Sequence, residues 1–325
     1  MMYFDYAALA GPRPESIYQE VNKNLRWLWG SPGRGSHSFA YEADRIVFNC
    51  RTLINDFFNV GDATRIAFTQ NCTEALNLAI NGTLKSGDEV ITTSMEHNSV
   101  LRPLKKREKE GTIKLHIVDA DTFGFVNPEK LCSLVTNKTA MVIVNHVSNV
   151  NGAIQDIEEI GAFLKNFPTL FLVDASQSAG SISINMKEMG IDLLAVPGHK
   201  YLMAPVGASF LAFSEKANPE PIILGGTGSF SSDLVQPSIL PDKLNSGTLN
   251  VPAIAGLKAG LEFLVRKKEI SSTKKLKQLF CDGIKKSNRV KLIGFNGNVG
   301  KYQSVFSLLA KNEKQEEFAE KLLAE

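Results

Sequence analysis

The sequence predicts an α/β protein built on a mostly parallel, doubly wound sheet of seven strands, and two observations support this prediction. First, seven short apolar runs lack a clear alternation of apolar and polar residues, which is typical of strands covered on both faces. Second, segments with apolar residues at helical spacing separate these runs, as expected when helices join parallel strands. The seven runs cover residues 65–69, 89–93, 113–118, 140–147, 170–174, 191–196 and 208–213.

The N-terminal part is predicted to hold an extended segment and two helices. A short extended piece at 3–8 precedes a helix that begins at Pro14, a residue suited to a first helical turn. Glycines and prolines make residues 30–37 a loop. Apolar residues at helical spacing over 43–58 predict a long second helix, which stops at Gly61. Further helices are expected to begin near Thr73, Asn98, Asn127 and Asp156.

The C-terminal part has a different pattern. Residues 225–250 are expected to form ordered loops, after which the spacing becomes helical and an α/β fragment follows. A charged helix at 314–325 closes the sequence. We therefore predict a large domain at 13–255 and a small domain made of 1–12 and 256–325.

Composition and charge limit the class of protein. With 325 residues, of which 43% are hydrophobic, the chain can bury a large core. The net charge is +2 and basic residues are spread along the chain, so neither a nucleic acid nor a membrane is expected as a partner. The four cysteines lack the spacing of a metal site or a disulfide framework, and no signal peptide or long apolar segment stands out. We therefore expect a cytoplasmic protein without a bound metal.

A lysine and an aspartate next to predicted strands are the leading candidates for chemistry. Lys200 follows the strand at 191–196, and an apolar setting lowers the pKa of a lysine and lets it form a Schiff base. Asp174 ends the strand at 170–174. Because ligands of open α/β sheets collect at the carboxyl ends of strands, the two side chains are expected to face one crevice. Pyridoxal phosphate needs such a pair, a lysine for its aldehyde and a carboxylate that keeps its ring nitrogen protonated.

Three further strand ends carry polar groups, each open to two interpretations. The turn within 68–77 points backbone N–H groups and the positive end of a helix dipole at one spot, which favours a phosphate site. The alternative is an ordinary helix start that Thr73 caps. His97 is either a catalytic group or a structural hydrogen-bonding residue. Asn149 either contacts a ring hydroxyl or shapes a turn.

Nine short motifs carry a family resemblance. They lie at 3–8, 32–37, 68–77, 95–103, 146–152, 173–177, 197–200, 225–228 and 246–252. In this order they resemble the motifs of the class V aminotransferase fold, a family of pyridoxal-phosphate enzymes. Within that family the sequence is most similar to the cysteine desulfurase and selenocysteine lyase group.

The resemblance implies a fold-type I enzyme that binds pyridoxal 5'-phosphate. It implies that Lys200 is the Schiff-base lysine, that Asp174 pairs with the pyridine nitrogen and that His97 stacks on the ring. Gln177 and Asn149 would flank the phenolic oxygen of the ring. By the same resemblance, Lys200, Asp174 and His97 are the catalytic residues.

The resemblance also implies a phosphate site and partners. Cys72, Thr73 and His199 would hold the phosphate, joined by Thr248 from the neighbouring subunit of a homodimer. The substrate would be a small amino acid, cysteine or selenocysteine, and a further protein would accept the sulfur.

Three features depart from the family pattern. After Tyr6 the sequence continues with alanines, where relatives have asparagine and threonines. Pro197 stands where many relatives have a phosphate-binding serine, and proline has no N–H or hydroxyl to donate. Relatives carry a sulfur-accepting cysteine and a carboxylate-binding arginine beyond the position of Glu325, so the small domain is expected to be incomplete at its C-terminal end.

Three functions therefore stay open on the sequence alone. The leading one is a cysteine desulfurase, which converts L-cysteine to L-alanine plus sulfur. A second is an aminotransferase or a C–S β-lyase on the same fold, which gains support because none of the four cysteines lies in a sulfur-acceptor motif. A third is a truncated, catalytically impaired homologue.

Overall fold

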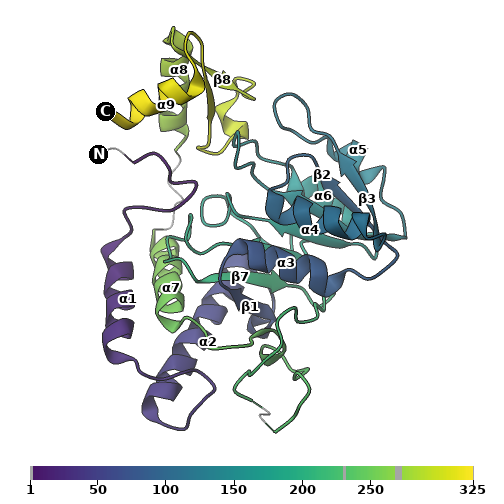
Figure 1. The fold of residues 1–325 in the computed structure, drawn as a ribbon, viewed down its shortest axis with the longest axis vertical. Helices are drawn as coiled ribbons and strands as arrows, with labels where there is room; N and C mark the ends of the chain where they lie inside the picture. Colours follow the sequence, from purple (N-terminus) through teal and green to yellow (C-terminus); the bar gives the residue numbers. More distant parts are fainter. Residues whose placement is uncertain (1–2, 230–231, 268–272, 325) are drawn as a thin grey trace.

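A seven-stranded sheet lies at the centre of the computed structural model, which describes residues 3–229, 232–267 and 273–324 (Figure 1). Each strand lies within two residues of its predicted ends. The strands are β1 (Ile66–Thr69), β2 (Asp88–Thr93), β3 (Ile113–Val118), β4 (Thr139–Asn145), β5 (Leu170–Asp174), β6 (Leu193–Val196) and β7 (Ser209–Phe213).

The topology of the sheet confirms the predicted fold class. The strand order is β1-β7-β6-β5-β4-β2-β3. Strands β3, β2, β4, β5 and β6 run parallel to one another, and only β7 is antiparallel to its neighbours β6 and β1. The sheet is therefore mostly parallel, and the carboxyl ends of its parallel strands meet at one edge.

Helices join the strands and extend the chain at both ends. The helix starts near Thr73, Asn98, Asn127 and Asp156 are confirmed within one residue. Glu325, the last residue of the predicted closing helix, lies outside the described residues. The helices are α1 (Glu15–Trp27), α2 (Ser38–Phe58), α3 (Cys72–Thr83), α4 (Asn98–Lys109), α5 (Pro128–Cys132), α6 (Ile157–Leu164), α7 (Val251–Arg266), α8 (Lys274–Lys286) and α9 (Gln315–Ala324).

Helices cover both faces of the sheet, which explains the absence of alternation in the strand sequences. In β4, Val142 and Val144 pack into the core formed with α2, α5, α6 and α7. Their neighbours Met141 and Ile143 pack into the opposite core, formed with α3 and α4. Successive residues of a strand point to opposite faces, so a strand buried on both sides needs apolar residues at every position.

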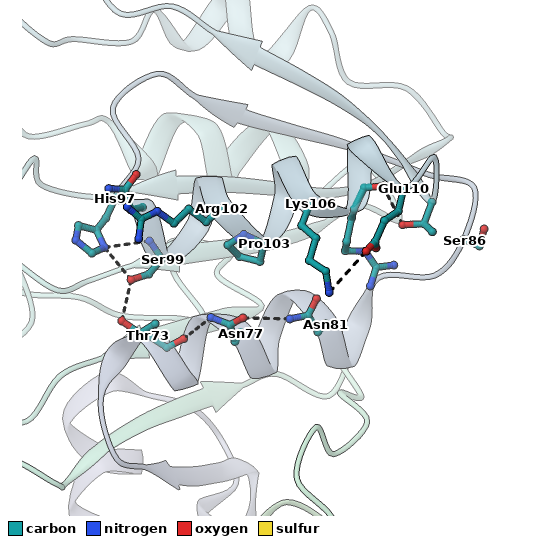
Figure 2. Close-up of a pocket in the computed structure, with 13 residues that line it drawn as sticks. Thr73, Asn77, Asn81, Ser86, His97, Ser99, Arg102, Pro103, Lys106 and Glu110 are labelled. Atoms are coloured by element: carbon teal, nitrogen blue, oxygen red, sulfur yellow. Dashed lines mark hydrogen bonds and ion pairs between the residues drawn. The ribbon is translucent and has the colours of Figure 1, made fainter.

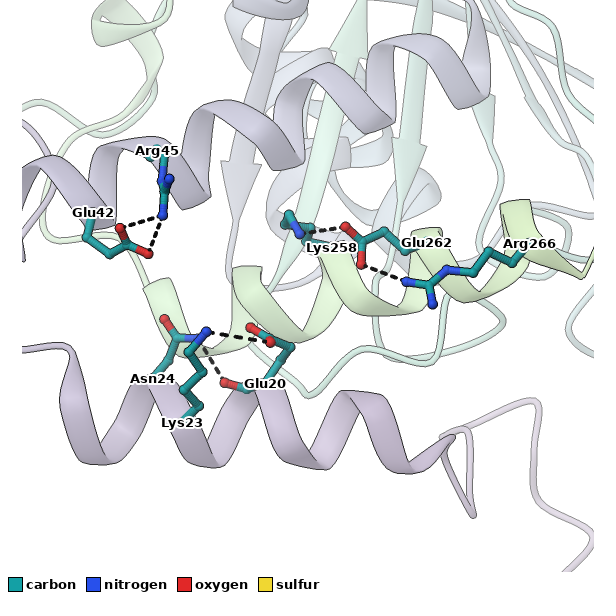
Figure 3. A network of polar contacts seen from close by, with 8 residues as sticks. All are labelled: Glu20, Lys23, Asn24, Glu42, Arg45, Lys258, Glu262 and Arg266. Carbon is teal, nitrogen blue, oxygen red and sulfur yellow. Dashed lines mark hydrogen bonds and ion pairs between the residues drawn. The ribbon is translucent and has the colours of Figure 1, made fainter.

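Three helices pack side by side at one end of the sheet. Helix α7 lies against both α1 and α2, and Figure 3 shows the charged side chains at their exposed edges. Glu262 forms ion pairs with Lys258 at 2.5 Å and with Arg266 at 3.4 Å. These pairs at (i, i+4) spacing on a partly exposed helix face contribute only a few tenths of a kcal/mol each (about 0.3–0.5), so burial of apolar area holds the three helices together.

Close backbone packing places the segment that carries Lys200. A Cβ atom added at Gly198 would lie 2.0 Å from the carbonyl oxygen of Ala208, so only glycine fits between β6 and β7 at this point. The amide of Ala204 donates to the carbonyl of Gly198 at 2.8 Å, and the amide of Met203 donates to that of Lys200 at 2.8 Å. The turn after β6 is therefore fixed by backbone contacts on both sides of the lysine.

A small α/β unit follows α7 and lies beyond one end of the sheet (Figure 1). Its strands β8 (Val290–Ile293) and β9 (Ser307–Ala310) form an antiparallel pair. The unit contacts the loop after β4, because Ala153 pairs with Tyr302 and the amide of Gln303 donates to the carbonyl of Gly152 at 2.8 Å. It therefore borders the edge of the sheet where the parallel strands end.

The domain division stays a prediction. The proposed boundary between residues 255 and 256 falls inside α7. The N-terminal segment, assigned to the small domain, contacts the turn after β6, since the amide of Ala10 donates to the carbonyl of His199 at 3.0 Å. Within the described ranges, no helix combines the length and apolar character needed to cross a membrane.

Candidate active site

A cavity of about 180 Å³ lies where the carboxyl ends of the parallel strands meet. Residues from the turns after β1, β2, β4, β5 and β6 line it, which is the arrangement expected for an open α/β sheet. Of the predicted site residues, Thr248 alone does not line this cavity. Those that line it are Cys72, Thr73, His97, Asn149, Asp174, Gln177, His199 and Lys200.

Asp174 is the last residue of β5 and is 1% exposed. Its Oδ1 accepts a hydrogen bond from the amide of Ser176 at 2.9 Å, and the thiol of Cys72 lies 3.8 Å from the same oxygen. No hydrogen bond to Oδ2 is found among the residues that the structure describes. The carboxylate is thus held by one oxygen, while the other stays available in the cavity that Lys200 also lines.

The start of α3 corrects one interpretation of the sequence. Asn71, not Thr73, is the N-cap, because its backbone is extended and its side chain accepts from the amide of Glu74 at 3.0 Å. Thr73 already lies inside the helix, so its hydroxyl is free for other contacts. The amides of Cys72 and Thr73 donate no hydrogen bond to any described residue, which leaves two donors at the positive end of the helix.

The thiol of Cys72 faces the carboxylate rather than solvent. Its Sγ accepts a hydrogen bond from the Ser176 hydroxyl at 3.2 Å and lies next to Asp174. Burial, together with the negative charge of Asp174, raises the pKa of Cys72 well above its ordinary value. The side chain is therefore a neutral thiol, and the backbone amide of Cys72 is the group suited to bind an anion.

His97 has the structural role that one of its two interpretations gave it, and its catalytic role stays a prediction. It is the N-cap of α4, and its Nδ1 accepts a hydrogen bond from the amide of Ser99 at 3.1 Å. The same ring lines the cavity that Asp174 and Lys200 also line. A structural role at Nδ1 thus leaves Nε2 as the ring nitrogen available for chemistry.

Two buried polar atoms at the cavity lack partners among the described residues. Gln177 donates through Nε2 to the carbonyl of Ala7 at 3.0 Å, but its Oε1 has no partner. The Nδ1 of His199 also has none, and burial and the positive charges of Lys200 and Arg13 lower the pKa of this histidine. Since buried polar atoms normally find partners, both atoms point to a ligand.

Asn149 lies in the turn that follows β4. Ser148 holds the turn through two hydrogen bonds. Its Oγ accepts from the amide of Val150 at 3.1 Å, and its carbonyl oxygen accepts from the amide of Gly152 at 3.0 Å. The side chain of Asn149 forms no hydrogen bond with a described residue. Asn149 itself lies in the turn before Gly152 and also lines the cavity, so both interpretations of this residue stay open.

Glu96, Ser99 and Ser176 are functional candidates that the sequence analysis missed. Ser176 holds Asp174 and Cys72, and Ser99 contacts both His97 and Thr73. All three stand within two residues of a predicted site residue at a strand end. This proximity is the only signal in the sequence. It is a weak signal, because a serine or glutamate next to a site residue is usually a surface group.

Glu96 is a buried carboxyl group that links two strand ends. Its Oε1 accepts from the Thr93 hydroxyl at 2.7 Å and from the amide of Asn145 at 2.9 Å, whereas Oε2 has no partner among the described residues. Burial raises the pKa of Glu96 to about 8, and the two hydrogen bonds oppose this shift only in part. The protonated form therefore connects β4 to the turn that carries His97.

We expect the Glu96→Gln protein to lose less stability than the parent as the pH rises. In the unfolded chain Glu96 releases its proton near 4.5, whereas in the folded chain it keeps the proton up to about 8. The stability that this proton contributes is complete below the pKa of the unfolded chain, near 4.5, and is lost as the pH rises through the pKa of the folded chain, about 8. Urea unfolding near pH 4.5 and near pH 8 measures how much the free energy of unfolding of each protein changes between the two pH values. Glu158→Gln, at an exposed position, is the control. Equal pH slopes for Glu96→Gln and the parent would contradict the assignment.

Thr248 lies outside the cavity and is exposed. Its predicted role in a neighbouring subunit is thus not tested by a single chain. Within the described part of the chain, no group of three or more His, Cys, Asp and Glu side chains is arranged to hold a metal ion.

Comparison with known proteins agrees with this geometry. The family described as aminotransferase class-V matches residues 2–325. A probable cysteine desulfurase of Methanothermobacter thermautotrophicus is 33% identical over 270 residues, which cover 82% of this chain and 67% of the relative. A putative cysteine desulfurase, IscS 1, of Bacillus subtilis is 33% identical over 87% of this chain and 72% of its own length.

Solved structures show the same similarity. The apo structure of a cysteine desulfurase from Thermococcus onnurineus NA1 superposes with a TM-score of 0.88 and 28% sequence identity, over 99% of this chain and 82% of that one. Because the family match spans nearly the whole sequence and the fold is the same, this chain belongs to the class V aminotransferase family.

Proposed function

We propose that the protein is a pyridoxal-phosphate-dependent cysteine desulfurase, which converts L-cysteine to L-alanine and passes the sulfur to an acceptor thiol. The observation that carries the proposal is the convergence of Lys200 and Asp174 in one cavity at the ends of β5 and β6. The similarity to proteins named cysteine desulfurases supports the choice of reaction.

The residues of the cavity suit pyridoxal phosphate. The unpaired amides at the start of α3 suit a phosphate group, which helix N-termini bind well. The buried Oε1 of Gln177, which has no partner in the described part of the chain, suits a ring substituent that donates or shares a proton. The free oxygen of Asp174 suits a protonated ring nitrogen, and Lys200 supplies the amine that an aldehyde needs.

Each residue has a task in the proposed reaction. When bound, pyridoxal phosphate supplies an electron sink for the α-carbon of the amino acid. Lys200 holds the cofactor and, once released from it, takes and returns the proton at the α-carbon. Asp174 would pair with the protonated ring nitrogen, and the amide of Ser176 fixes the orientation of the carboxyl group. His97 lines the cavity from the start of α4, and its Nε2 is the ring nitrogen that would be available to the substrate.

The four cysteines of this sequence are poor sulfur acceptors. All are buried free thiols, and burial raises the pKa of each, to about 12 for Cys50 and about 11 for Cys132. A sulfur acceptor must be a thiolate within reach of the substrate sulfur. We infer that the acceptor is another thiol. The same observation favours a C–S β-lyase as the second candidate, because elimination of the sulfur needs no protein thiol.

The products from L-cysteine distinguish the two candidates. We expect the protein with pyridoxal phosphate and a thiol reductant to release alanine and sulfide, with unchanged rates in the Cys72→Ser variant because that thiol is protonated and faces Asp174. Pyruvate and ammonia in place of alanine would establish the lyase. Alanine release that disappears in Cys72→Ser would show that this thiol is the acceptor after all.

We further propose that the protein is a homodimer in which Thr248 contacts the phosphate of the neighbouring subunit. Thr248 is exposed, and apolar side chains are exposed on the preceding loop, at Leu224, Leu234, Val235 and Ile239. Burial of such side chains is favourable at about 25 cal/mol per Å². Sedimentation is expected to give a dimer, and the Thr248→Ala protein is expected to bind pyridoxal phosphate more weakly while remaining dimeric. A monomer that binds the cofactor tightly would refute both points.

We also propose a cytoplasmic location and a separate protein as the sulfur acceptor. The four unpaired, buried thiols suit a reducing compartment. Cysteine, rather than selenocysteine, is the substrate that the names of the relatives support.

A further inference from the structure

Three groups form a continuous hydrogen-bonded chain from α3 to the cavity-lining ring of α4. The Oγ1 of Thr73 lies 2.8 Å from the Oγ of Ser99, and that oxygen lies 2.8 Å from the Nδ1 of His97. Figure 2 shows the three side chains in line, bridging the gap between the two helices. Ser99 is 7% exposed, whereas Thr73 and His97 at the two ends are exposed, so a ligand can reach both ends of the chain.

The backbone fixes the role of one end of the chain. Nδ1 of His97 accepts a hydrogen bond from the amide of Ser99 at 3.1 Å, and an amide can only donate. Nδ1 is therefore the unprotonated ring nitrogen, and the proton of the neutral ring is on Nε2. The Ser99 hydroxyl can then act toward Nδ1 only as a second donor.

Each hydroxyl has a single proton, so the direction of the chain depends on what Thr73 donates to. If Thr73 donates to Ser99, then Ser99 donates to His97, and Nδ1 receives two hydrogen bonds. If Thr73 donates instead to an anion, it can only accept from Ser99. The Ser99 proton then turns to Thr73, and Nδ1 retains the amide alone.

An anion at Thr73 has independent support in the structure. The amides of Cys72 and Thr73 are unpaired within the described residues and lie at the start of the 12-residue helix α3. The side chain of Gln177 lines the same cavity and is 2% exposed, and its buried Oε1 has no partner in residues 3–229, 232–267 and 273–324. The two observations point to a ligand with an anionic group at one end and a hydrogen-bond donor at the other.

We propose that Ser99 is a positioning residue that couples anion binding at Thr73 to the hydrogen bonding of His97. An anion at the start of α3 withdraws the Ser99 hydroxyl proton from Nδ1 and leaves the proton on Nε2 in place. The proposal rests on the proposed function for the identity of the anion, the cofactor phosphate. Under this proposal, Nδ1 of His97 accepts two hydrogen bonds when the phosphate is absent and one when it is present.

Nuclear magnetic resonance of the cofactor-free protein tests this coupling. With ¹⁵N-labelled histidine, we expect the Nδ1 resonance of His97 to move toward that of a less hydrogen-bonded nitrogen as inorganic phosphate is added. Backbone amide resonances of Cys72 and Thr73 report whether phosphate binds. The His97→Asn variant identifies the resonance among those of the five histidines.

Matched variants distinguish two causes of the shift at Nδ1 of His97: coupling through Ser99 and the direct electrostatic effect of the anion on the ring. In Ser99→Ala at saturating phosphate, the shift should fall to less than half of the parent value, whereas Ser99→Thr, which keeps a hydroxyl, should restore it. Thr73→Val should also lose the shift, and Thr73→Ser should retain it. The full shift in Ser99→Ala would overturn the proposal, as would phosphate that leaves the amides of Cys72 and Thr73 unmoved.

The experiment is independent of the proposed enzyme activity. Inorganic phosphate needs no covalent attachment at Lys200, so the coupling can fail while pyridoxal phosphate still binds at that lysine. Conversely, the coupling can be present in a chain that never binds the cofactor at Lys200. The two failures are therefore distinguishable.

Discussion

The Lys200→Ala protein is expected to lose the covalent attachment of pyridoxal phosphate and all but a trace of its activity on L-cysteine. Lys200 is the lysine that lines the cavity shared with Asp174, and the backbone around it is fixed by close packing at Gly198. Loss of a nucleophilic amine removes both the attachment and the group that moves the α-proton, so activity should fall by several orders of magnitude.

Borohydride reduction followed by peptide mass spectrometry measures the attachment directly. The parent protein should carry the reduced cofactor on the peptide with Lys200, and the variant should carry none. Exposed Lys187→Ala serves as the control and should retain both the yellow colour and the adduct. An adduct on another lysine in the Lys200→Ala protein would show that the wrong residue was assigned.

The position of the site could be predicted from the sequence because it depends on a simple property of parallel sheets. Apolar runs locate the strands, and the carboxyl ends of parallel strands share one edge. Polar residues that follow those runs must then meet, as Lys200, Asp174 and His97 do. No knowledge of the helix packing was needed for this step.

The contacts that orient the site residues depend on packing that the sequence does not reveal. Ser99 and Thr73 belong to different helices, and their hydroxyls meet only because α3 and α4 pack side by side on one face of the sheet. Gln177 is held by the carbonyl of Ala7, 170 positions away in the sequence. No periodicity or motif in the sequence predicts such contacts.

Local rules also failed where two residues of similar chemistry compete for one position. Asn71 and Thr73 are both good helix caps, and the choice depends on where the backbone turns after β1. Asn71 is extended and caps the helix through the amide of Glu74, while Glu74 accepts in return from the amide of Gln70 at 2.8 Å. These two hydrogen bonds satisfy the amides of Glu74 and Gln70 at the same helix start.

Replacement of Asp174 is expected to have the second large effect, on the chemistry rather than on cofactor attachment. A carboxylate within 4–6 Å favours the protonated form of a ring nitrogen, by about 1–3 pKa units in comparable pairs. The Asp174→Asn side chain has the same shape but no charge, so the ring nitrogen loses this support. Exchange of the substrate α-proton should slow by several orders of magnitude, while Lys200 still carries the cofactor.

Exchange of the α-proton of L-alanine in deuterated water, followed by nuclear magnetic resonance, isolates this step because it involves no sulfur transfer. Cys72→Ala is the matched control: it removes the thiol 3.8 Å from Asp174 Oδ1 but keeps the carboxylate and its hydrogen bond from the Ser176 amide at 2.9 Å. Its exchange rate should stay within a few-fold of the parent rate. Slow exchange in both variants would show that packing around the carboxylate matters rather than its charge, and normal exchange in Asp174→Asn would exclude the electrostatic role. The charge of Asp174 is decisive only if exchange collapses in Asp174→Asn alone, with the borohydride adduct at Lys200 intact.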